Sequence, residues 1–509
     1  MYSNKENVNI LTSLLVAHGI RHAVVCPGSR NAPIVHNLHT CPDIRCYPVT
    51  DERSAAFYAL GMAQATGQPV VVCVTSGTAL LNVLPAVAEA YYQQRPLVVV
   101  SADRPQQWID QQAGQTLPQP DALGRFVRKA VTLVEPRDAE EHWYCNRLVN
   151  EALLECHGPV HINVPISEPL FDFSVASLPE ERKIERVPAD MSPMVHGDLI
   201  DSFMSARRPM LISGQPMNPL MDEAVQIVAD DDSYVPDLVL YAGGSIVSKR
   251  LKRFLRRARE TWVVNRTGEV TDTFMNLTRV FQGNPNAVAY EVSAMLEQQS
   301  HPFVARWQQL LARVAARVED YEPPYSQMAA VRCLESHALT GPVHYANSTA
   351  IRLANIYARH HVWCNRGVNG IDGSVSTAAG CSCVTADQVL CITGDLSFFY
   401  DQNALWNSNL HGNLRILLLN NGGGAIFRSL PGLAASPARD TFVAACHGAT
   451  AEGICLENGV AYRQVRQMGD LSGAIDWLLE TDSEHPLLLE VLTEASADAR
   501  ALQAFHDSL

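Results

Sequence analysis

Short apolar runs, each separated from the next by a longer stretch of mixed polar and apolar residues, dominate the first third of the chain. The clearest runs lie at 22–26, 70–75, 97–101 and 160–165. Runs of this length with turn residues beside them are typical of strands buried on both faces of a parallel sheet. The stretches between them are long enough for helices, and 54–66 is one example. We therefore expect residues 1–180 to form an α/β domain in which helices cover a parallel sheet.

The pattern changes twice further along the chain. Between about 170 and 190 the residues become polar and include prolines, which indicates a linker. A middle segment with short apolar runs ends in a charged helical stretch at 301–320, which Pro323-Pro324 terminates. A chain of 509 residues exceeds one hydrophobic core. We expect three domains, of which the central α/β domain is the smallest: 1–180, 190–320 and 325–509.

Composition and charge narrow the class of protein. Hydrophobic residues make up 47% of the chain and charged residues 18%, which is typical of a globular protein. No apolar run approaches the roughly 18 residues needed to span a bilayer, and the polar start indicates no signal or transit peptide, so we expect a cytoplasmic protein. The formal net charge of −14 argues against nucleic acid or an anionic membrane as a partner. Thirteen scattered cysteines lack zinc-site spacing, so we expect reduced thiols.

A candidate site for a divalent cation and phosphate follows two neighbouring strands of the third domain. Gly394-Asp395-Leu396-Ser397 comes directly after the apolar run 389–392, and Gly394 is expected to allow a tight turn. The next strand, 415–419, ends in Asn420-Asn421-Gly422-Gly423. Because parallel strands bind ligands at their carboxyl ends, the two segments are expected to meet and offer the oxygen ligands that Mg²⁺ prefers. The alternative is that Asp395 or Ser397 only caps a helix.

The arrangement of these two segments resembles the signature of thiamine-diphosphate-dependent enzymes, in which a Gly-Asp pair and a later Asn close one strand–helix–strand unit. The resemblance implies that 1–180 and 325–509 are the pyrimidine-binding and diphosphate-binding domains of that fold. It requires a glutamate at the start of a helix in the first domain, where Glu52 stands. This side chain would hydrogen-bond the aminopyrimidine and activate the cofactor; alternatively, Glu52 only favours a helix N-terminus. In these enzymes a site is shared between subunits, which implies at least a dimer.

Basic residues beside glycine or serine, in loops at predicted sheet edges, point to the substrate. Guanidinium groups bind carboxylates bidentately, so the pattern favours small substrates with several carboxylates, although each residue alone could be a solvated surface group. The segments are Ser29-Arg30, Asp103-Arg104, Lys249-Arg250, 348–352 and Asn365-Arg366.

These loops, together with Asp51-Glu52-Arg53 and the segment 424–431, resemble the 2-succinyl-5-enolpyruvyl-6-hydroxy-3-cyclohexene-1-carboxylate synthase family of menaquinone biosynthesis. The resemblance implies a transferase that decarboxylates 2-oxoglutarate and adds the remaining four-carbon unit to a ring carbon of isochorismate. It implies thiamine diphosphate and Mg²⁺, or Mn²⁺ in its place, as cofactors. It also implies a homodimer, or a homotetramer built as a dimer of dimers, with the sites at the subunit interface.

The same resemblance assigns a role to each candidate residue. The metal ligands would be Asp395, Asn421 and the carbonyl of Gly423. The catalytic residues would be Glu52, Arg30, Arg352 and Arg366. The cofactor would also contact Ile371, which supports its bent form, and Gly394, Leu396 and Ser397. The substrates would contact Ser29, Arg30, Arg104, Gln115, Lys249, Arg250, Ser348, Arg352, Arg366 and an apolar wall of Ile426, Phe427 and Leu430.

Two features depart from the family pattern. The loop 112–115 reads Gln-Ala-Gly-Gln where the family has Gly-Ala-Asn-Gln, so an expected amide contact is missing at Gly114. The segment 227–237 is short, because the family has an additional strand and loop there. Either the central domain is shortened or residues are missing from the chain.

Two other hypotheses remain at this stage. A related 2-oxo-acid decarboxylase or acetolactate-type carboligase would share the cofactor motif but have fewer carboxylate-binding arginines. A non-catalytic protein that keeps the fold would be expected to have lost Glu52 or Asp395, and both are present.

Overall fold

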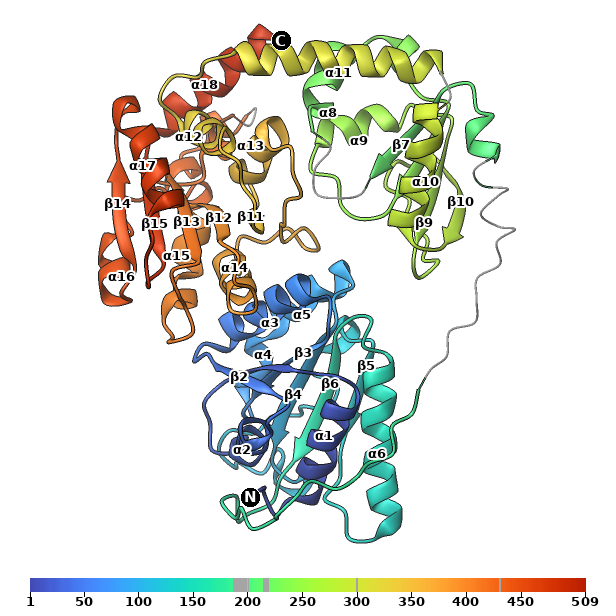
Figure 1. Ribbon diagram of the computed structural model, residues 1–509, viewed down its shortest axis with the longest axis vertical. Coiled ribbons are helices and arrows are strands. Elements are labelled where there is room, and N and C mark those ends of the chain that lie inside the picture. Colours follow the sequence, from blue (N-terminus) through green and yellow to red (C-terminus); the bar gives the residue numbers. More distant parts are fainter. Residues whose placement is uncertain (186–198, 200, 214–218, 299–300, 430–431) are drawn as a thin grey trace.

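The computed structural model describes residues 1–185, 199, 201–213, 219–298, 301–429 and 432–509. Within them the chain forms three sheets whose strands all run parallel, with helices packed over them (Figure 1). The expected α/β fold class is confirmed. Two sequence predictions fall outside the described residues: the start of the central domain at 190, and Leu430 of the apolar wall.

The first sheet has six strands in the order β2-β1-β3-β4-β6-β5. Every residue of β3 and β4 is buried, which explains why these strands are continuous apolar runs. The strands are β1 (His22–Val25), β2 (Arg45–Pro48), β3 (Val70–Val74), β4 (Leu97–Asp103), β5 (Lys129–Thr132) and β6 (Val160–Pro165). The helices are α1 (Glu6–Ala17), α2 (Ala32–Thr40), α3 (Glu52–Thr66), α4 (Thr78–Asn82), α5 (Leu84–Gln93) and α6 (Ala139–Leu154).

The central sheet has four strands in the order β10-β9-β8-β7. β7 pairs directly with β8, from Pro209 opposite Leu238 to Ser213 opposite Ala242, so the sheet is continuous across the predicted shortening. The strands are β7 (Pro209–Ser213), β8 (Leu238–Ala242), β9 (Glu260–Asn265) and β10 (Leu277–Gln282). The helices are α8 (Met221–Ile227), α9 (Lys249–Leu255), α10 (Pro285–Gln298) and α11 (Pro302–Asp320).

The third sheet has five strands in the order β11-β12-β13-β15-β14. Its three middle strands are almost wholly buried, as expected for apolar runs covered on both faces. The strands are β11 (Val343–Tyr345), β12 (Val389–Gly394), β13 (Leu414–Asn420), β14 (Ala461–Val465) and β15 (Leu487–Leu492). The helices are α12 (Gln327–Glu335), α13 (Thr349–Tyr357), α14 (Ser374–Ser382), α15 (Asp395–Tyr400), α16 (Glu452–Glu457), α17 (Met468–Glu480) and α18 (Ala495–Ser508).

Helices α3 and α14 join the first and third domains of the same chain (Figure 1). Two glycines allow the backbones to approach closely. A Cβ at Gly61 would lie 1.9 Å from the carbonyl oxygen of Thr377, and a Cβ at Gly380 would lie 2.1 Å from that of Tyr58. The buried hydroxyl of Tyr58 donates to the carbonyl of Ala404 at 2.6 Å. The two helices therefore form a packed interface that carries the loops before α14.

Helix α11 links the central domain to the third (Figure 1). Its buried side consists of Phe303, Trp307, Leu310, Val314 and Val318, at the helical spacing that the sequence predicted.

No helix of the described residues is long and apolar enough to cross a membrane. All thirteen cysteines are free thiols, most of them buried or partly buried.

Candidate active site

Asp395 and Asn421 leave the third sheet at the same edge. Strands β12 and β13 are parallel neighbours in which Gly394 lies opposite Leu419, so the residues that follow each strand emerge side by side. Asp395 is 4% exposed and begins α15. Its Oδ2 accepts the backbone N–H of Gly423 at 2.9 Å and that of Asn421 at 3.2 Å. The prediction that the two segments meet at one sheet edge is confirmed.

The carboxylate of Asp395 is held on both oxygens. Its Oδ1 accepts the N–H of Leu396 at 2.7 Å, and His447 Nε2 lies 3.5 Å from Oδ2. Burial raises the pKa of Asp395, while the N–H donors and His447 act in the opposite direction. The helix-capping alternative therefore describes only part of what this side chain does, because two of its donors come from the neighbouring loop.

Glycines shape this edge in two different ways. Gly422 and Gly423 have φ of +76° and +144°, which other residues rarely adopt. Gly394 has φ of −85°, a conformation that any residue can adopt, so the backbone turn there does not require glycine. A Cβ at Gly394 would meet nothing within 4 Å. What glycine provides there is open space in front of the strand end, into which a phosphate can approach.

The donor set fits a hard cation bound to a diphosphate. The Nδ2 of Asn421 donates to Asp498, which leaves its Oδ1 for another partner. The carbonyl of Gly423 accepts one N–H, from Ala425, and keeps a second lone pair. The described residues contain no group of three or more His, Cys, Asp or Glu side chains that could hold a metal. A cation here would depend on few protein oxygens plus phosphate and water, as Mg²⁺ commonly does.

Glu52 begins α3 on the first domain. Asp51 caps the helix by accepting the N–H groups of Arg53 and Ser54. The Glu52 carboxylate is half-buried and accepts a hydrogen bond from Asn82 Nδ2 at 3.2 Å. Its two neighbours reach the third domain: Asp51 accepts from Asn403, and Arg53 donates to the carbonyl of Tyr400 at the end of α15. The first domain thus presents Glu52 beside the helix that Asp395 begins.

A small cavity of about 100 Å³ lies where the two domains meet. Glu89, on α5 and 3% exposed, closes part of it by accepting the backbone N–H groups of Gly367 at 2.6 Å and Val368 at 2.7 Å. Further along the same loop, the carbonyl of Ile371 accepts the hydroxyl of Ser397 at 2.6 Å, while the Ile371 side chain is 40% exposed. The lining residues are Phe57, Pro85, Ala88, Glu89, Asn365, Val368, Gly370 and Asp372.

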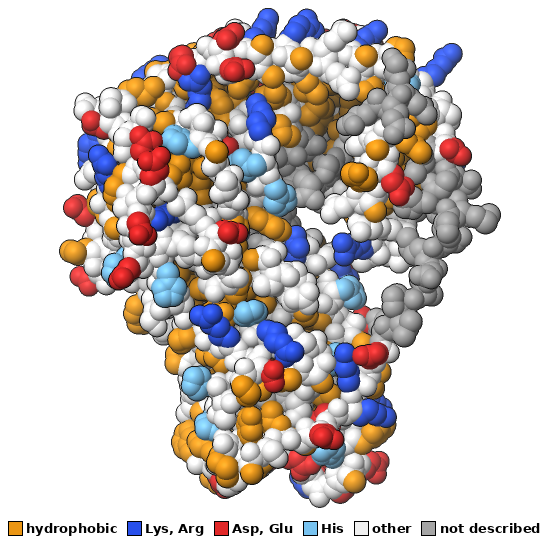
Figure 2. Space-filling model, viewed as in Figure 1, with side chains coloured by type: hydrophobic (Ala, Val, Ile, Leu, Met, Phe, Trp, Pro, Cys, Tyr) orange, Lys and Arg blue, Asp and Glu red, His pale blue; other side chains and the backbone are white. Residues whose placement is uncertain are grey.

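Cationic side chains from the central and third domains gather at one place. Arg352 and Arg366 are close enough that, besides burial, the charge of Arg366 lowers the pKa of Arg352. Burial also lowers the pKa of Lys252 on α9, and Arg366, Arg256 and Lys249 lower it further. Figure 2 shows an opening where the three domains meet, with Lys and Arg side chains at its rim. Such a cluster of cations is suited to anionic substrates.

Comparison with known proteins agrees with this geometry. A family model described as thiamine pyrophosphate enzyme, N-terminal TPP binding domain, matches residues 6–123. The 2-succinyl-5-enolpyruvyl-6-hydroxy-3-cyclohexene-1-carboxylate synthase of Bacteroides thetaiotaomicron is 43% identical over 560 residues, covering 100% of both chains. The synthase of the same name from Phocaeicola vulgatus is 40% identical over 557 residues, covering 100% of this chain and 99% of the relative. This chain belongs to that synthase family.

Membership of the synthase family confirms the resemblance seen in the sequence. The chain is an enzyme of the transferase type with thiamine diphosphate as its cofactor, which favours this class over the two other hypotheses. The alignment with the Bacteroides synthase spans 560 residues, more than the 509 of this chain. That relative therefore has residues without a counterpart in this chain.

Two predicted arginines of the first domain, Arg30 and Arg104, are bound within that domain in this member of the synthase family. Arg30 is 6% exposed and donates to the carbonyl of Ile166 at 3.0 Å and to Glu168 at 3.1 Å. Arg104 donates its Nε to the carbonyl of Gly114 at 3.0 Å. The loop that lacks the family asparagine thus still contacts Arg104, through its backbone.

The remaining predicted residues lie at several places. Arg250 pairs with Asp222 at 3.3 Å, whereas Lys249, Ser29 and Gln115 are exposed. Ser348 precedes α13 with φ of +76°. Ile426 and Phe427 are partly buried in a short 3₁₀ helix, and the Phe427 ring packs against Gly424.

The sequence analysis did not identify two residues of the site, Lys252 and Glu89. Lys252 lies one helical turn after Ser248 and Lys249 on α9. That spacing was the feature of the sequence that could have indicated Lys252 as a residue of the site. Glu89 is a lone carboxylate on an otherwise apolar helix side, which is a recognisable signal for a buried polar role.

A larger cavity of about 650 Å³, lined by residues such as Arg332, Tyr357 and Met468, contains none of the predicted site residues.

Proposed function

We propose that this chain decarboxylates 2-oxoglutarate and adds the remaining four-carbon unit to isochorismate. The product is 2-succinyl-5-enolpyruvyl-6-hydroxy-3-cyclohexene-1-carboxylate, and the reaction belongs to menaquinone biosynthesis. The observation that carries the proposal is a cation cluster in a chain of this family: burial and the charge of Arg366 lower the pKa of both Lys252 and Arg352. The name of the relatives supports the product.

The cofactor is proposed to bind at the edge formed by β12 and β13, with Mg²⁺, or Mn²⁺ in its place, between Asp395 and its diphosphate. Asp395, Asn421 Oδ1 and the Gly423 carbonyl supply the protein ligands. The open space before Gly394 and the N–H of Ser397, in the first turn of α15, favour the approach of phosphate oxygens. Bound thiamine diphosphate would supply the nucleophilic carbon and the electron sink that decarboxylation of a 2-oxo acid requires.

Glu52 and Ile371 are proposed to act on the pyrimidine half of the cofactor. Glu52 hydrogen-bonds pyrimidine N1′ and exchanges a proton there, which sets the tautomer that activates the cofactor. Ile371 would support the bent form of the cofactor, and its side chain is 40% exposed. Glu89 holds the loop that precedes Ile371, which keeps that support in place.

The substrates are proposed to bind through their carboxylates. 2-Oxoglutarate and isochorismate each carry two carboxylates, and a protein of net charge −14 repels both at long range. Four cationic side chains are proposed to make the electrostatic potential positive near the site: Arg352, Arg366, Lys249 and Lys252. Further contacts are proposed for Ser29, Arg30, Arg104, Gln115, Arg250, Ser348, Ile426, Phe427 and Leu430.

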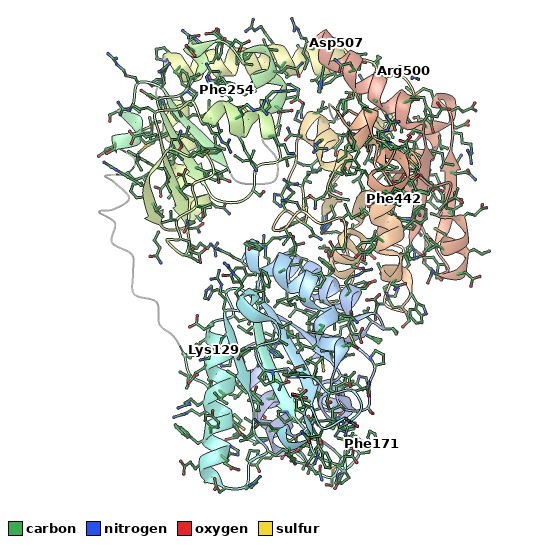
Figure 3. The ribbon with its side chains drawn as sticks, turned by 180° about the vertical axis from the view of Figure 1, so that it is seen from behind. Lys129, Phe171, Phe254, Phe442, Arg500 and Asp507 are labelled. Carbon is green, nitrogen blue, oxygen red and sulfur yellow. The ribbon has the colours of Figure 1, made fainter. Side chains whose placement is uncertain are left out.

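The chain is proposed to work as a homodimer, or as a dimer of dimers, with domains at 1–180, 190–320 and 325–509. Exposed aromatic side chains of the third domain support association: Trp406 is 58% exposed, and Phe442, which Figure 3 labels, is 81% exposed. A partner that covers these side chains would also bring a second Glu52 to the site, as in enzymes of this class.

The proposal is tested with the purified protein, thiamine diphosphate and Mg²⁺. We expect CO₂ release from 2-oxoglutarate to rise when isochorismate is added, and the product mass to appear only when both substrates are present. Pyruvate should be a poor substrate, since it lacks the second carboxylate. Preferential turnover of pyruvate would favour an acetolactate-type carboligase and contradict the proposal.

A further inference from the structure

Two carboxylates, Glu490 (buried) and Asp498 (partly buried), accept hydrogen bonds from the amide nitrogens of the two adjacent asparagines in the proposed metal loop. Glu490, on β15 and 0% exposed, accepts the Nδ2 of Asn420 at 2.7 Å. Asp498, on α18, accepts the Nδ2 of Asn421 at 2.8 Å. Helix α18, which carries Arg500 and Asp507, lies along the outer side of the third domain (Figure 3). The last helix of the chain therefore reaches the loop where a cation is proposed to bind.

The surroundings of Asp498 determine how the Asn421 amide is turned. Oδ1 of Asp498 accepts the backbone N–H of Gln327 at 2.8 Å, and Oδ2 accepts both the Thr493 hydroxyl at 2.8 Å and Asn421 Nδ2. An ionised carboxylate can only accept hydrogen bonds. The nitrogen of Asn421 must therefore face Asp498, and its oxygen must face away.

A metal ligand has to be the amide oxygen, because the amide NH₂ group has no lone pair available for a hard cation. We propose that Asp498 is a positioning residue that selects Oδ1 of Asn421 as the cation-facing atom. This inference rests on the proposed function, since it requires a divalent cation between Asp395 and Asn421. Asp498 does not touch the cation; it acts through Asn421, as outer-shell partners of metal ligands commonly do.

Asn420 shows the same arrangement one residue earlier. Its Nδ2 faces Glu490, and its Oδ1 accepts the N–H of Gly422 at 3.0 Å, which holds the turn from which Gly423 presents its carbonyl. Glu490 is itself fixed by the Tyr462 hydroxyl at 2.5 Å. Glu490 thus stabilises the loop backbone, whereas Asp498 acts on the ligand side chain, so the two carboxylates have separable effects.

The substitution Asp498→Asn tests this role without changing the size of the side chain. The backbone N–H of Gln327 cannot turn, so it keeps an oxygen of residue 498 in front of it. The new NH₂ group must then occupy the position of Oδ2 and face the NH₂ of Asn421, donor against donor. The Asn421 amide is expected to turn over, which presents its NH₂ group to the cation.

The experiment measures Mn²⁺ binding by the electron paramagnetic resonance signal of free Mn²⁺, at saturating thiamine diphosphate, for four proteins. We expect Asp498→Asn to bind Mn²⁺ roughly 10- to 100-fold more weakly than the unaltered chain. The double variant Asn421→Asp with Asp498→Asn should recover most of the affinity. In that variant, one oxygen of the new carboxylate at position 421 accepts from the new NH₂ group at position 498, and the other oxygen faces the cation. Asp507→Asn, on the exposed side of the same helix, is the control and should bind as the unaltered chain does.

The outcomes separate this inference from the proposed function. If the unaltered chain does not bind Mn²⁺, the proposed metal dependence fails, and the inference fails with it. If it binds Mn²⁺ but Asp498→Asn binds equally well, only the inference is overturned. If Asp498→Asn weakens binding and the double variant does not recover it, the effect is structural and the inference is also overturned. Circular dichroism without metal shows that each variant is folded.

Discussion

The Glu89 carboxylate accepts the backbone N–H of Gly367 at 2.6 Å, which joins α5 of the first domain to the loop before α14 in the third. The two residues are 278 positions apart in the chain. Because Glu89 is buried and also accepts the N–H of Val368, this pair fixes the loop on which Arg366 and Ile371 lie. The interface between the two domains thereby orders part of the proposed active site.

Substitution of this carboxylate should loosen the loop. In Glu89→Gln one N–H of Gly367 or Val368 would face an NH₂ group, and an unsatisfied buried donor costs about 1–3 kcal/mol. We expect amide hydrogen exchange in residues 365–372 to become roughly 10- to 100-fold faster. Glu151→Gln is the control, because Glu151 forms only surface ion pairs with Lys129 and Arg147. Equal exchange in the two variants would refute the role of Glu89.

Glu52→Gln should separate cofactor binding from turnover. The amide can still hydrogen-bond the pyrimidine, but it cannot exchange a proton at N1′. Turnover is expected to fall by roughly 10²- to 10⁴-fold, the usual contribution of a positioned acid or base, while the dissociation constant of thiamine diphosphate stays nearly the same. Steady-state kinetics and calorimetric titration measure the two quantities. Unchanged turnover would contradict the assigned role.

Lys252→Met and Arg366→Met should weaken substrate binding. Each removes one cation from the cluster, and a hydrogen bond to a charged group contributes about 1.5–3 kcal/mol. We expect KM for 2-oxoglutarate or isochorismate to rise roughly 10- to 100-fold, and its dependence on ionic strength to decrease. Lys129→Met, on β5 of the first domain (Figure 3), serves as the control. A cluster that only stabilises the fold would leave KM unchanged in both variants.

Two buried histidines should make the fold sensitive to acid. Burial lowers the pKa of His161 to about 4, and burial together with His361 lowers that of His344 to about 3. The ordinary pKa of histidine is 6.5. Below that pH these two side chains therefore bind more protons in the unfolded chain than in the folded chain. The free energy of unfolding is therefore highest above pH 6.5 and decreases as the pH falls towards 4. The decrease due to His161 is on the order of 3 kcal/mol.

Thermal unfolding between about pH 7.5 and 4.5 measures this effect. The melting temperature of His161→Asn should fall less over that range than that of the unaltered chain. His39→Asn removes an exposed histidine and should leave the pH dependence as it is. A His161→Asn variant with the same pH dependence as the unaltered chain would show that His161 does not contribute.

The parts of the molecule that follow from local pattern were predictable from the sequence. Apolar runs located β3, β4, β12 and β13, since a strand buried on both faces has no polar side. The rule that parallel strands bind ligands at their carboxyl ends then brought Asp395 and Asn421 together. Their meeting did not depend on any contact between distant parts of the chain.

The parts that depend on tertiary contacts were not predictable. Glu89, Lys252 and Asp498 acquire their roles only through segments that are distant in the chain. A lone carboxylate on an apolar helix side marks Glu89 as a candidate for a buried polar role, but no local pattern identifies the partners of any of the three. Arg30 makes further tertiary contacts that the sequence did not indicate: its guanidinium donates to the carbonyl of Ile166 and to Glu168.

The central claim is that thiamine diphosphate and a divalent cation bind at the edge between β12 and β13, next to Glu52. A crystal structure of the protein with thiamine diphosphate and Mg²⁺ tests it most directly. The account predicts a cation bound by Asp395, Asn421 Oδ1 and the Gly423 carbonyl, and a Glu52 carboxylate, from this chain or its partner, hydrogen-bonded to pyrimidine N1′. A cofactor bound elsewhere, or a cation without these ligands, would contradict it.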